Sequence, residues 1–387
     1  MTVGHLPIFL SGGLRYGPSR YESDGSFEFD GDELNIHVPQ SMESRAELEE
    51  LMHITWNIMT PQAGQPCMNL VQDCMSSIYC MSIDEHLFSV DEAMQMYAQL
   101  APFEALQAFD ATKTMWLASD MLSWLLPSNF TCSIKKLRFK KGQIIRTTPP
   151  TPITSKEFGV IIHLLCRWPV EGDLLSTRAS LERTALVFTY AQRLGLAYFG
   201  HRGFSVGIKQ CLPSKAQQKD IKHVLEEGLL RAEQMAIRHH LERTTTDRIH
   251  EMNMTRTLEA TSSSAGAIAH AFIGEQPLKN GIDIMMTSGA KGKINNIMQM
   301  SACVGQQIIG GQRPKDAYMG RTLPLFDGME TKCDPKARGY IENSYVGGMT
   351  SSEFFAGQQG GREGLTDTSV ATQVYFKLPV SSFFSLC

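Results

Sequence analysis

The sequence feature that most constrains the fold is a pair of long helical segments in the second half of the chain. Pro213 and Ser214 make a good helix start. Apolar residues then recur at helical spacing, at Ile221, Val224, Leu225, Leu229, Ala232, Met235 and Ala236. A second helical stretch runs from about residue 248 to residue 272. Long amphipathic helices that follow each other closely can pack as an antiparallel pair, so we expect a structural helical hairpin here.

The rest of the chain predicts a mixture of helices and strands. Residues 44–52 suit a short amphipathic helix, and residues 143–145 form a strand candidate. Residues 160–165 form an apolar run that we expect to be buried, and glycines become frequent from residue 289 onwards. The expected fold class is therefore α+β.

Bulk properties exclude several classes of protein. The 387 residues suffice for two or three packed modules. We expect neither secretion nor membrane spanning, because no apolar run is long enough to cross a bilayer. The nine cysteines form no C-x-x-C pair, so we expect reduced thiols in the cytosol or nucleus. The net charge of -4 indicates that, if the chain contacts nucleic acid, partner subunits supply much of the positive charge.

Residues 28–32, Glu-Phe-Asp-Gly-Asp, place three carboxylates in a tight turn. Glu28, Asp30 and Asp32 alternate along the chain, so an extended segment would point them to one side, and Gly31 allows a sharp turn. Such oxygen ligands suit Mg²⁺, which usually completes its shell with phosphates or water. A D-G-D tripeptide alone is more often an exposed turn.

The surrounding sequence resembles the active-site signature of the largest subunit of multisubunit DNA-dependent RNA polymerases. The signature is FDGDELNIHVPQS at 29–41. Further likeness follows in order at 45–47, 60–62, 66–68, 71–73, 203–208, 288–292, Asn295, Gln299, 302–307, 321–324, 339–345, 353–355 and 360–368. The likeness spans roughly residues 27–373 and is closest to eukaryotic and large-DNA-virus enzymes.

This resemblance implies a metal-dependent nucleotidyl transfer. Glu28, Asp30 and Asp32 would bind the permanent active-site Mg²⁺, and a second ion would arrive with the nucleotide. The implied reaction is attack of an RNA 3'-hydroxyl on the α-phosphate of a nucleoside triphosphate. Glu28 replaces an aspartate of the pattern, and Ser26 replaces the asparagine that helps to recognise the ribose.

The resemblance also implies residues near the substrate or nucleic acid. Arg362, Thr368 and Thr372 would lie on the bridge helix along the active centre, although ordinary polar helix positions explain them equally well. Lys291, in a glycine-rich turn, could face phosphates in the nucleotide-entry channel, with a solvated lysine as the alternative.

The modules that the resemblance implies begin with part of a double-psi β-barrel. The expected boundaries are 1–70 for this metal-loop module, 71–200 for a pore-like module, 201–342 for a helical funnel and 343–373 for the start of the bridge helix. The tail at 374–387 does not match, and we expect Pro379 to break a helix there. These limits suggest a fragment, a split gene or a frameshifted reading frame.

The implied partners are the second-largest polymerase subunit, further polymerase subunits, template DNA, the RNA transcript and nucleoside triphosphates, with no membrane. The expected location is the nucleus, or the host cytoplasm or virion if the protein is viral. The alternative function is a truncated, non-catalytic remnant or interaction module.

Other chemistries fit the sequence less well. Residues 288–293 lack the first glycine and the Ser or Thr of a P-loop. Ser205 matches G-x-S-x-G, which recurs easily by chance. His239-His240 and His250-Glu251 lack metalloprotease spacing, so we expect them on the polar helix face. The basic run at 135–141 favours a solvated strand or hairpin face over nucleic-acid contact.

Overall fold

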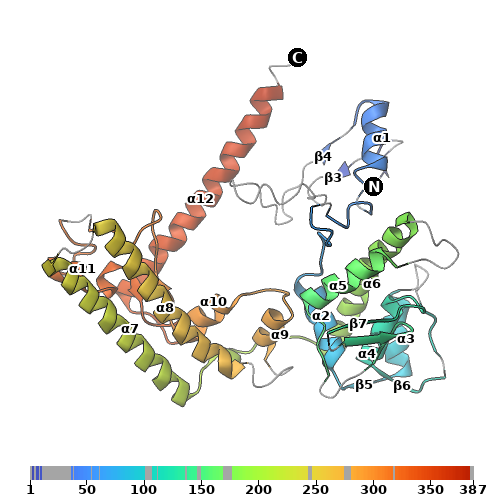
Figure 1. Ribbon diagram of the computed structural model, residues 1–387, viewed down its shortest axis with the longest axis horizontal. Coiled ribbons are helices and arrows are strands. Elements are labelled where there is room, and N and C mark those ends of the chain that lie inside the picture. Colours follow the sequence, from blue (N-terminus) through green and yellow to red (C-terminus); the bar gives the residue numbers. More distant parts are fainter. Residues whose placement is uncertain are drawn as a thin grey trace. The chain divides into compact units, whose positions relative to one another are not determined.

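The computed structural model of the chain divides into two compact units (Figure 1). The first holds residues 1–205 and 284–291, and the second holds residues 206–283 and 292–387. The structure describes residues 2–3, 6–7, 9–10, 36–37, 39–53, 55–60, 62–100, 107–110, 112–135, 137–145, 150–168, 177–242, 246–273, 280–316 and 319–383.

The first unit combines helices with short antiparallel strands. Its described helices are α1 (Met42–Glu50), α2 (Gln72–Ile83), α3 (Val90–Ala98), α4 (Ala118–Met121), η2 (Leu122–Leu125), α5 (Ser155–Cys166) and α6 (Thr177–Arg202). Its described strands are β1 (Thr2–Val3), β2 (Leu6–Pro7), β3 (Phe9–Leu10), β4 (Ile36–His37), β5 (Leu87–Ser89), β6 (Met115–Leu117), β7 (Cys132–Ile134), β8 (Leu137–Lys140) and β9 (Gln143–Ile145). The helix expected at 44–52 and the strand expected at 143–145 are both present.

The second unit is mostly helical. Its described elements are η3 (Ile208–Cys211), α7 (Lys215–Glu242), α8 (Asp247–Ile273), α10 (Ile294–Ile297), η4 (Met298–Ala302), β10 (Gly305–Gln306), α11 (Gly328–Cys333), η5 (Lys336–Arg338), β11 (Tyr340–Ile341) and α12 (Ser351–Phe383). Helix α9 (Gly281–Thr287) crosses the boundary between the units. The described chain thus holds both helices and strands, as expected, but it is mostly helical, with small antiparallel sheets.

The largest described sheet has the order β7-β8-β9 and is antiparallel. Leu137 and Phe139 on β8 are buried, whereas Arg138 and Lys140 between and after them are exposed. This alternation follows from the two-residue side-chain period of a strand. The basic run is thus an exposed strand face, as expected from the sequence.

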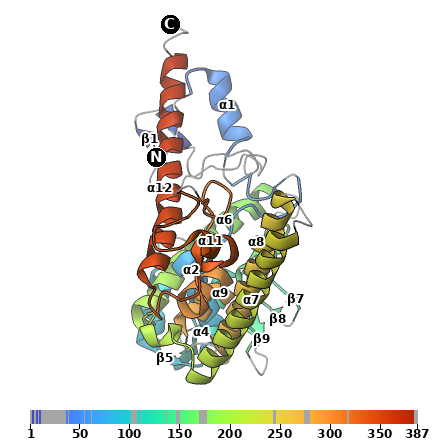
Figure 2. The ribbon, with the colours of Figure 1, turned by 90° about the vertical axis from the view of Figure 1, so that its left-hand side faces the viewer.

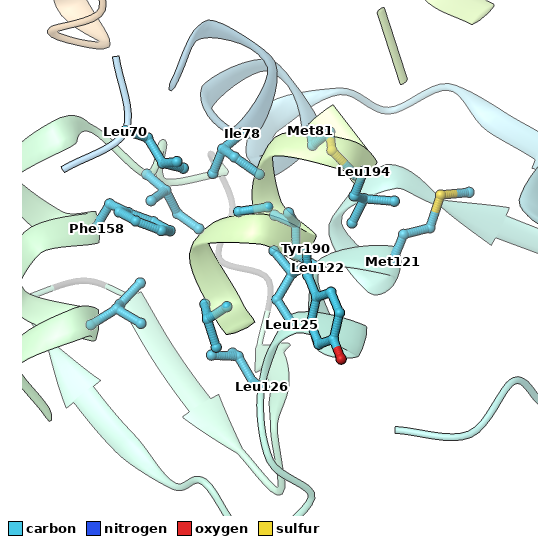
Figure 3. Packing of buried hydrophobic residues seen from close by; sticks show 14 of the residues in the cluster. Leu70, Ile78, Met81, Met121, Leu122, Leu125, Leu126, Phe158, Tyr190 and Leu194 are labelled. Atoms are coloured by element: carbon cyan, nitrogen blue, oxygen red, sulfur yellow. The ribbon is translucent and has the colours of Figure 1, made fainter. Parts of the chain in front are cut away.

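Helix α2 lies in the core of the first unit, where every residue from Met75 to Ile83 is buried. Figure 3 shows Ile78 and Met81 of α2 among apolar side chains from other elements, including Leu194 of α6. A Cβ at Gly195 on α6 would lie 2.1 Å from the Ser77 hydroxyl oxygen. Glycine therefore allows α6 to approach α2 closely. The apolar run at 160–165 forms part of α5, with Ile161, Ile162 and Leu165 buried.

A buried carboxylate joins the end of α2 to the end of α6. One oxygen of Asp84 accepts hydrogen bonds from the Tyr198 hydroxyl at 2.7 Å and from Arg202 Nε at 3.1 Å. The other accepts the His86 backbone N–H at 3.0 Å. Burial raises the pKa of Asp84, but these hydrogen bonds and the Arg202 charge outweigh burial and hold the pKa below its ordinary value. Asp84 is therefore satisfied as an ion inside the unit.

Helices α7 and α8 lie side by side as the expected hairpin (Figures 1 and 2). Ser214 and Gln217 form a reciprocal capping box at the start of α7. The apolar positions predicted on α7 face inward, with Ile221, Leu225, Ala232 and Ala236 buried. Gly228 faces Thr261 of α8, because a Cβ at residue 228 would lie 2.2 Å from the Thr261 methyl group. A small residue on α7 thus brings the two helices together.

Two expectations about this unit are wrong. His239 and His250 do not project from the polar face of the hairpin, because their rings stack on each other across it. Helix α12 also continues through Pro379 to Phe383, although a helix break was expected there. Proline fixes a backbone φ that is compatible with a helix, although within a helix it removes one hydrogen bond and crowds the carbonyl oxygen four residues earlier.

The described part of the chain contains no helix that is both long and apolar enough to span a membrane. The eight cysteines at positions that the structure describes are all free thiols, as expected.

Candidate functional site

The acidic turn falls outside the described residues. Ser26, Glu28, Asp30 and Asp32 therefore remain sequence predictions, and the structure describes only the strands on either side of them. Strand β3 pairs with β4, with Phe9 opposite His37 and Leu10 opposite Ile36. The candidate metal loop is thus part of the segment that joins two paired strands. The chemistry of its donors, three carboxylates around a glycine, fits Mg²⁺.

Lys291 belongs to a turn that anchors two helices of the first unit. The carbonyl oxygen of Ala290 accepts the N–H of Gln72, the first residue of α2, at 3.1 Å. The carbonyl oxygen of Ser288 accepts the N–H of Ser155, the first residue of α5, at 2.7 Å. The first N–H groups of a helix have no acceptor within the helix. This turn supplies one carbonyl acceptor to each of the two helices.

The same turn explains one glycine and leaves the lysine side chain exposed. Gly289 has a φ of +78°, and a Cβ there would lie 2.9 Å from Ser155 Cβ. Lys291 is exposed, and its backbone N–H donates a hydrogen bond to the carbonyl oxygen of Met285 at 3.2 Å. The turn follows helix α9 and not a strand, which supports the rejection of a P-loop. The backbone of this turn therefore stabilises the first unit, and the Lys291 side chain is exposed.

The start of α12 is held by one buried carboxylate, Glu353. Its Oε2 accepts the backbone N–H and the hydroxyl of Thr350, each at 2.8 Å, and the Asn343 side-chain amide at 2.8 Å. Its Oε1 accepts the N–H groups of Glu342 at 3.0 Å and Asn343 at 3.2 Å. Burial raises the pKa of Glu353, but the donors from Asn343 and Thr350 together hold that pKa below its ordinary value.

Residues 353–355 carry part of the family likeness, but Glu353 is not among the site residues predicted from the sequence. The signal is nevertheless present, because Thr350 and Glu353 have the spacing of a capping box. No sequence pattern predicts the additional hydrogen bonds that Glu353 accepts from residues 342 and 343. They join the residues after β11 to the first turn of α12.

Farther along α12, a loop of the second unit contacts the helix. A Cβ at Gly360 would lie 3.1 Å from Gln307 Oε1, and Glu363 accepts the N–H of Gly310 at 2.6 Å. Arg362 is exposed beside these contacts, and its backbone carbonyl oxygen accepts a hydrogen bond from the Thr366 hydroxyl one turn later. The helix is thus fixed by contacts on one side, while the Arg362 side chain projects into solvent.

Thr368 and Thr372 lie one turn apart on α12. The structure confirms that both residues lie within a helix. The structure therefore groups Arg362, Thr368 and Thr372 on one helix, and places Lys291 in the other unit.

Ser205 does not occupy a nucleophile elbow. Its segment follows helix α6 and leads into the short helix η3, whereas an elbow requires a turn from a strand into a helix. This setting supports the rejection of a hydrolase serine.

Three consecutive family models match the chain. RNA polymerase Rpb1, domain 2 matches residues 20–54, domain 3 matches residues 57–211, and domain 4 matches residues 231–341. The first of these ranges contains the acidic turn, the second covers much of the first unit, and the third contains most of the hairpin.

The chain is similar in sequence to the DNA-directed RNA polymerase subunit Rpo1N of Halobacterium salinarum (strain ATCC 29341 / DSM 671 / R1). It is 29% identical over 359 residues, which cover 89% of this chain and 35% of the archaeal subunit. The chain thus spans about a third of the length of this relative. From the three ordered domains and this relative together, we conclude that the chain belongs to the family of the largest subunits of multisubunit RNA polymerases.

Proposed function

We propose that this chain takes part in DNA-templated RNA synthesis, as a piece of the catalytic subunit of a multisubunit RNA polymerase. The reaction is nucleotidyl transfer from a nucleoside triphosphate to an RNA 3'-hydroxyl. The observation that carries the proposal is the ordered match of domains 2, 3 and 4, the first of which includes the acidic turn at residues 28–32.

Glu28, Asp30 and Asp32 would hold the Mg²⁺ ion. Bound there, the ion would lower the pKa of the attacking hydroxyl and stabilise charge at the transferred phosphate, and a second ion would enter with the nucleotide. Arg362 and Lys291 offer exposed positive charge to phosphates. Thr368 and Thr372 would contact nucleic acid from α12, and Ser26 would stand near the ribose.

The structural assignments of the modules are part of the same proposal. The metal loop would belong to a partial double-psi β-barrel within residues 1–70, followed by pore-like (71–200) and funnel-like (201–342) modules. Residues 343–373 would begin the bridge helix. The long helix α12, capped at Thr350 and Glu353, supports this last assignment.

The proposed partners are the second-largest polymerase subunit, the other polymerase subunits, template DNA and the RNA transcript. The net charge of -4 supports this arrangement, since a basic partner must then supply positive charge along the nucleic acid. We further propose a eukaryotic or large-DNA-virus type of enzyme, located in the nucleus, or in the host cytoplasm or virion. Sequencing of the flanking DNA tests the type, and tagging of the protein in its host tests the location.

The activity is tested by reconstitution with the partner subunits and the remaining parts of the largest subunit. We expect Mg²⁺-dependent RNA extension that Asp30→Ala and Asp32→Ala each abolish, because each removes a metal ligand. Asp220→Ala is the matched control, since Asp220 is an exposed carboxylate on α7. Equal extension by all three variants would refute the role of the acidic turn.

A second candidate, a non-catalytic polymerase remnant, is favoured by one observation. Glu28 is one methylene longer than the aspartate of the family pattern, and small displacements of reacting groups reduce catalytic rates steeply. Glu28→Asp separates the candidates. Extension by the natural chain supports the catalytic function, whereas extension only after Glu28→Asp, or no extension in either case, supports the remnant.

A further inference from the structure

Two imidazoles stack across the tip of the α7–α8 hairpin. The rings of His239, near the end of α7, and His250, in the first turns of α8, have centroids 3.9 Å apart and planes inclined by 7°. Asp247 reaches the same pair, with its Oδ1 3.7 Å from His239 Nε2. The His239 side chain is only 16% exposed. The histidine pair is therefore a packed contact between the helices.

Charged side chains of α8 and of later residues act on His250. Next to it in sequence, Glu251 contacts Arg313 at 3.4 Å and Arg338 at 2.6 Å. The Arg313 side chain is 4% exposed, so its charge is poorly screened by water. Helix α11 also packs on α7 and carries Glu330 and Lys332. One carboxylate on α8 is thus shared by two arginines close to the histidine pair.

Protonation of the histidine pair opposes this packing. A charge on either ring must be desolvated, and two charged rings at this separation repel each other. Burial, then His239, lowers the pKa of His250, and Arg313 and Arg338 also lower it while Glu251 raises it. The net direction is downward from the ordinary value of 6.5.

The direction of the pKa shift fixes the sign of the pH dependence. When the helix ends separate, water reaches the His250 ring, which then takes up a proton near its ordinary pKa of 6.5, whereas the stacked arrangement holds the pKa of His250 lower. The open state therefore binds more protons as the pH falls through 6.5. Closure is favoured above this pH and weakened below it. The carboxylates Asp84 and Glu353 titrate below their ordinary values of 3.8 and 4.5, which separates their effects from this one.

We propose that the stacked His239–His250 pair is a pH-sensitive latch, which closes the hairpin tip near neutral pH and releases it under mildly acidic conditions. Neutral rings stack and hold the ends of α7 and α8 together. Protonated rings repel each other, and the neighbouring arginines add to the repulsion. This property belongs to the hairpin itself and holds whatever reaction the assembled protein performs.

Hydrogen exchange of the full chain tests the latch. We compare backbone protection of residues 236–242 and 246–254, the ends of α7 and α8, at about pH 7.5 and about pH 5.5, corrected for the intrinsic rate, because histidine changes charge between these values. We expect protection of the tip to fall several-fold, with a ceiling of about tenfold for one histidine between these two pH values, while α2 and α5 keep theirs. Equal protection of the tip at both pH values would overturn the proposal.

The key variant is His250→Phe, which keeps an aromatic ring but cannot be protonated. We expect it to lose the pH response. His223→Phe should keep the response, because His223 lies on α7, the helix that carries His239, with a side chain 71% exposed. A full response in His250→Phe would contradict the latch. An NMR titration of the natural chain gives an independent test, and titration of His250 at or above pH 6.5 would also contradict it.

Discussion

At the scale of single residues, the most informative side chains are buried carboxylates with several donors. Asp84 lies at the C-terminal end of α2, and Glu353 lies in the first turn of α12. A carboxylate in such a setting remains ionised, because the hydrogen bonds that it accepts outweigh the cost of burial. Each therefore fixes the end of a helix.

Replacement of Glu353 tests this role. We expect Glu353→Gln to lower the free energy of unfolding of the second unit by about 1–3 kcal/mol, because an amide group must then face N–H and O–H donors. Glu363→Gln is the matched control on the same helix, since the structure describes one N–H, that of Gly310, as its donor. Urea denaturation followed by circular dichroism measures both. A loss for Glu353→Gln no larger than for the control would show that the buried acceptor contributes little.

At the scale of elements, glycines set the distance between packed helices. Gly195 allows α6 to approach Ser77 of α2, and Gly228 allows α7 to approach Thr261 of α8. Glycine in a helix normally costs stability relative to alanine, so its presence at these two contacts is explained by close packing. In both units, the close approach of these two helices thus depends on the absence of a side chain at the glycine.

Gly228→Ala tests this packing. Its Cβ would overlap the Thr261 methyl group, so we expect a loss of about 1–3 kcal/mol from the second unit in spite of the better helix propensity of alanine. Gly361→Ala on α12 is the control, because nothing lies within 4 Å of its added Cβ. We expect that variant to be neutral or up to about 1 kcal/mol more stable. Thermal unfolding measures both, and a stabilised Gly228→Ala would contradict the close contact.

At the scale of the whole molecule, the chain leaves the first unit after residue 205 and returns to it at residues 284–291. The returning segment supplies carbonyl oxygens to the first residues of α2 and α5, and Ile284 and Ala290 to the core. The first unit is therefore completed by residues that follow the hairpin in sequence. The stability of this unit therefore depends on a long-range closure, by which we mean the contacts of residues 284–291 with α2 and α5.

Gly289→Val tests this closure. Valine is strained at a φ of +78° and would collide with Ser155, so we expect a loss of at least about 2 kcal/mol in the first unit. Hydrogen exchange should show reduced protection in α2 and α5, with α7 and α8 unchanged. Gly310→Val is the control, since Gly310 also has a positive φ but lies in the second unit with nothing within 4 Å of an added Cβ. Loss of protection in both units would show that the effect is not confined to the closure.

The sequence by itself determined the features that depend on near neighbours. Helical spacing predicted α7, and Pro213 and Ser214 predicted its start. The two-residue period of β8 placed Arg138 and Lys140 outward. The ordered motifs around the acidic turn predicted the polymerase family, which the domain matches support.

Only the tertiary structure decided which distant residues meet. The stacking of His239 on His250, the return of residues 288–290 to α2 and α5, and the bonds from Glu353 to residues 342 and 343 depend on how whole elements pack. Arg338 contacts Glu251, which lies 87 residues earlier in the chain. No local periodicity encodes such a pair, because its free energy arises only after both elements have folded and packed.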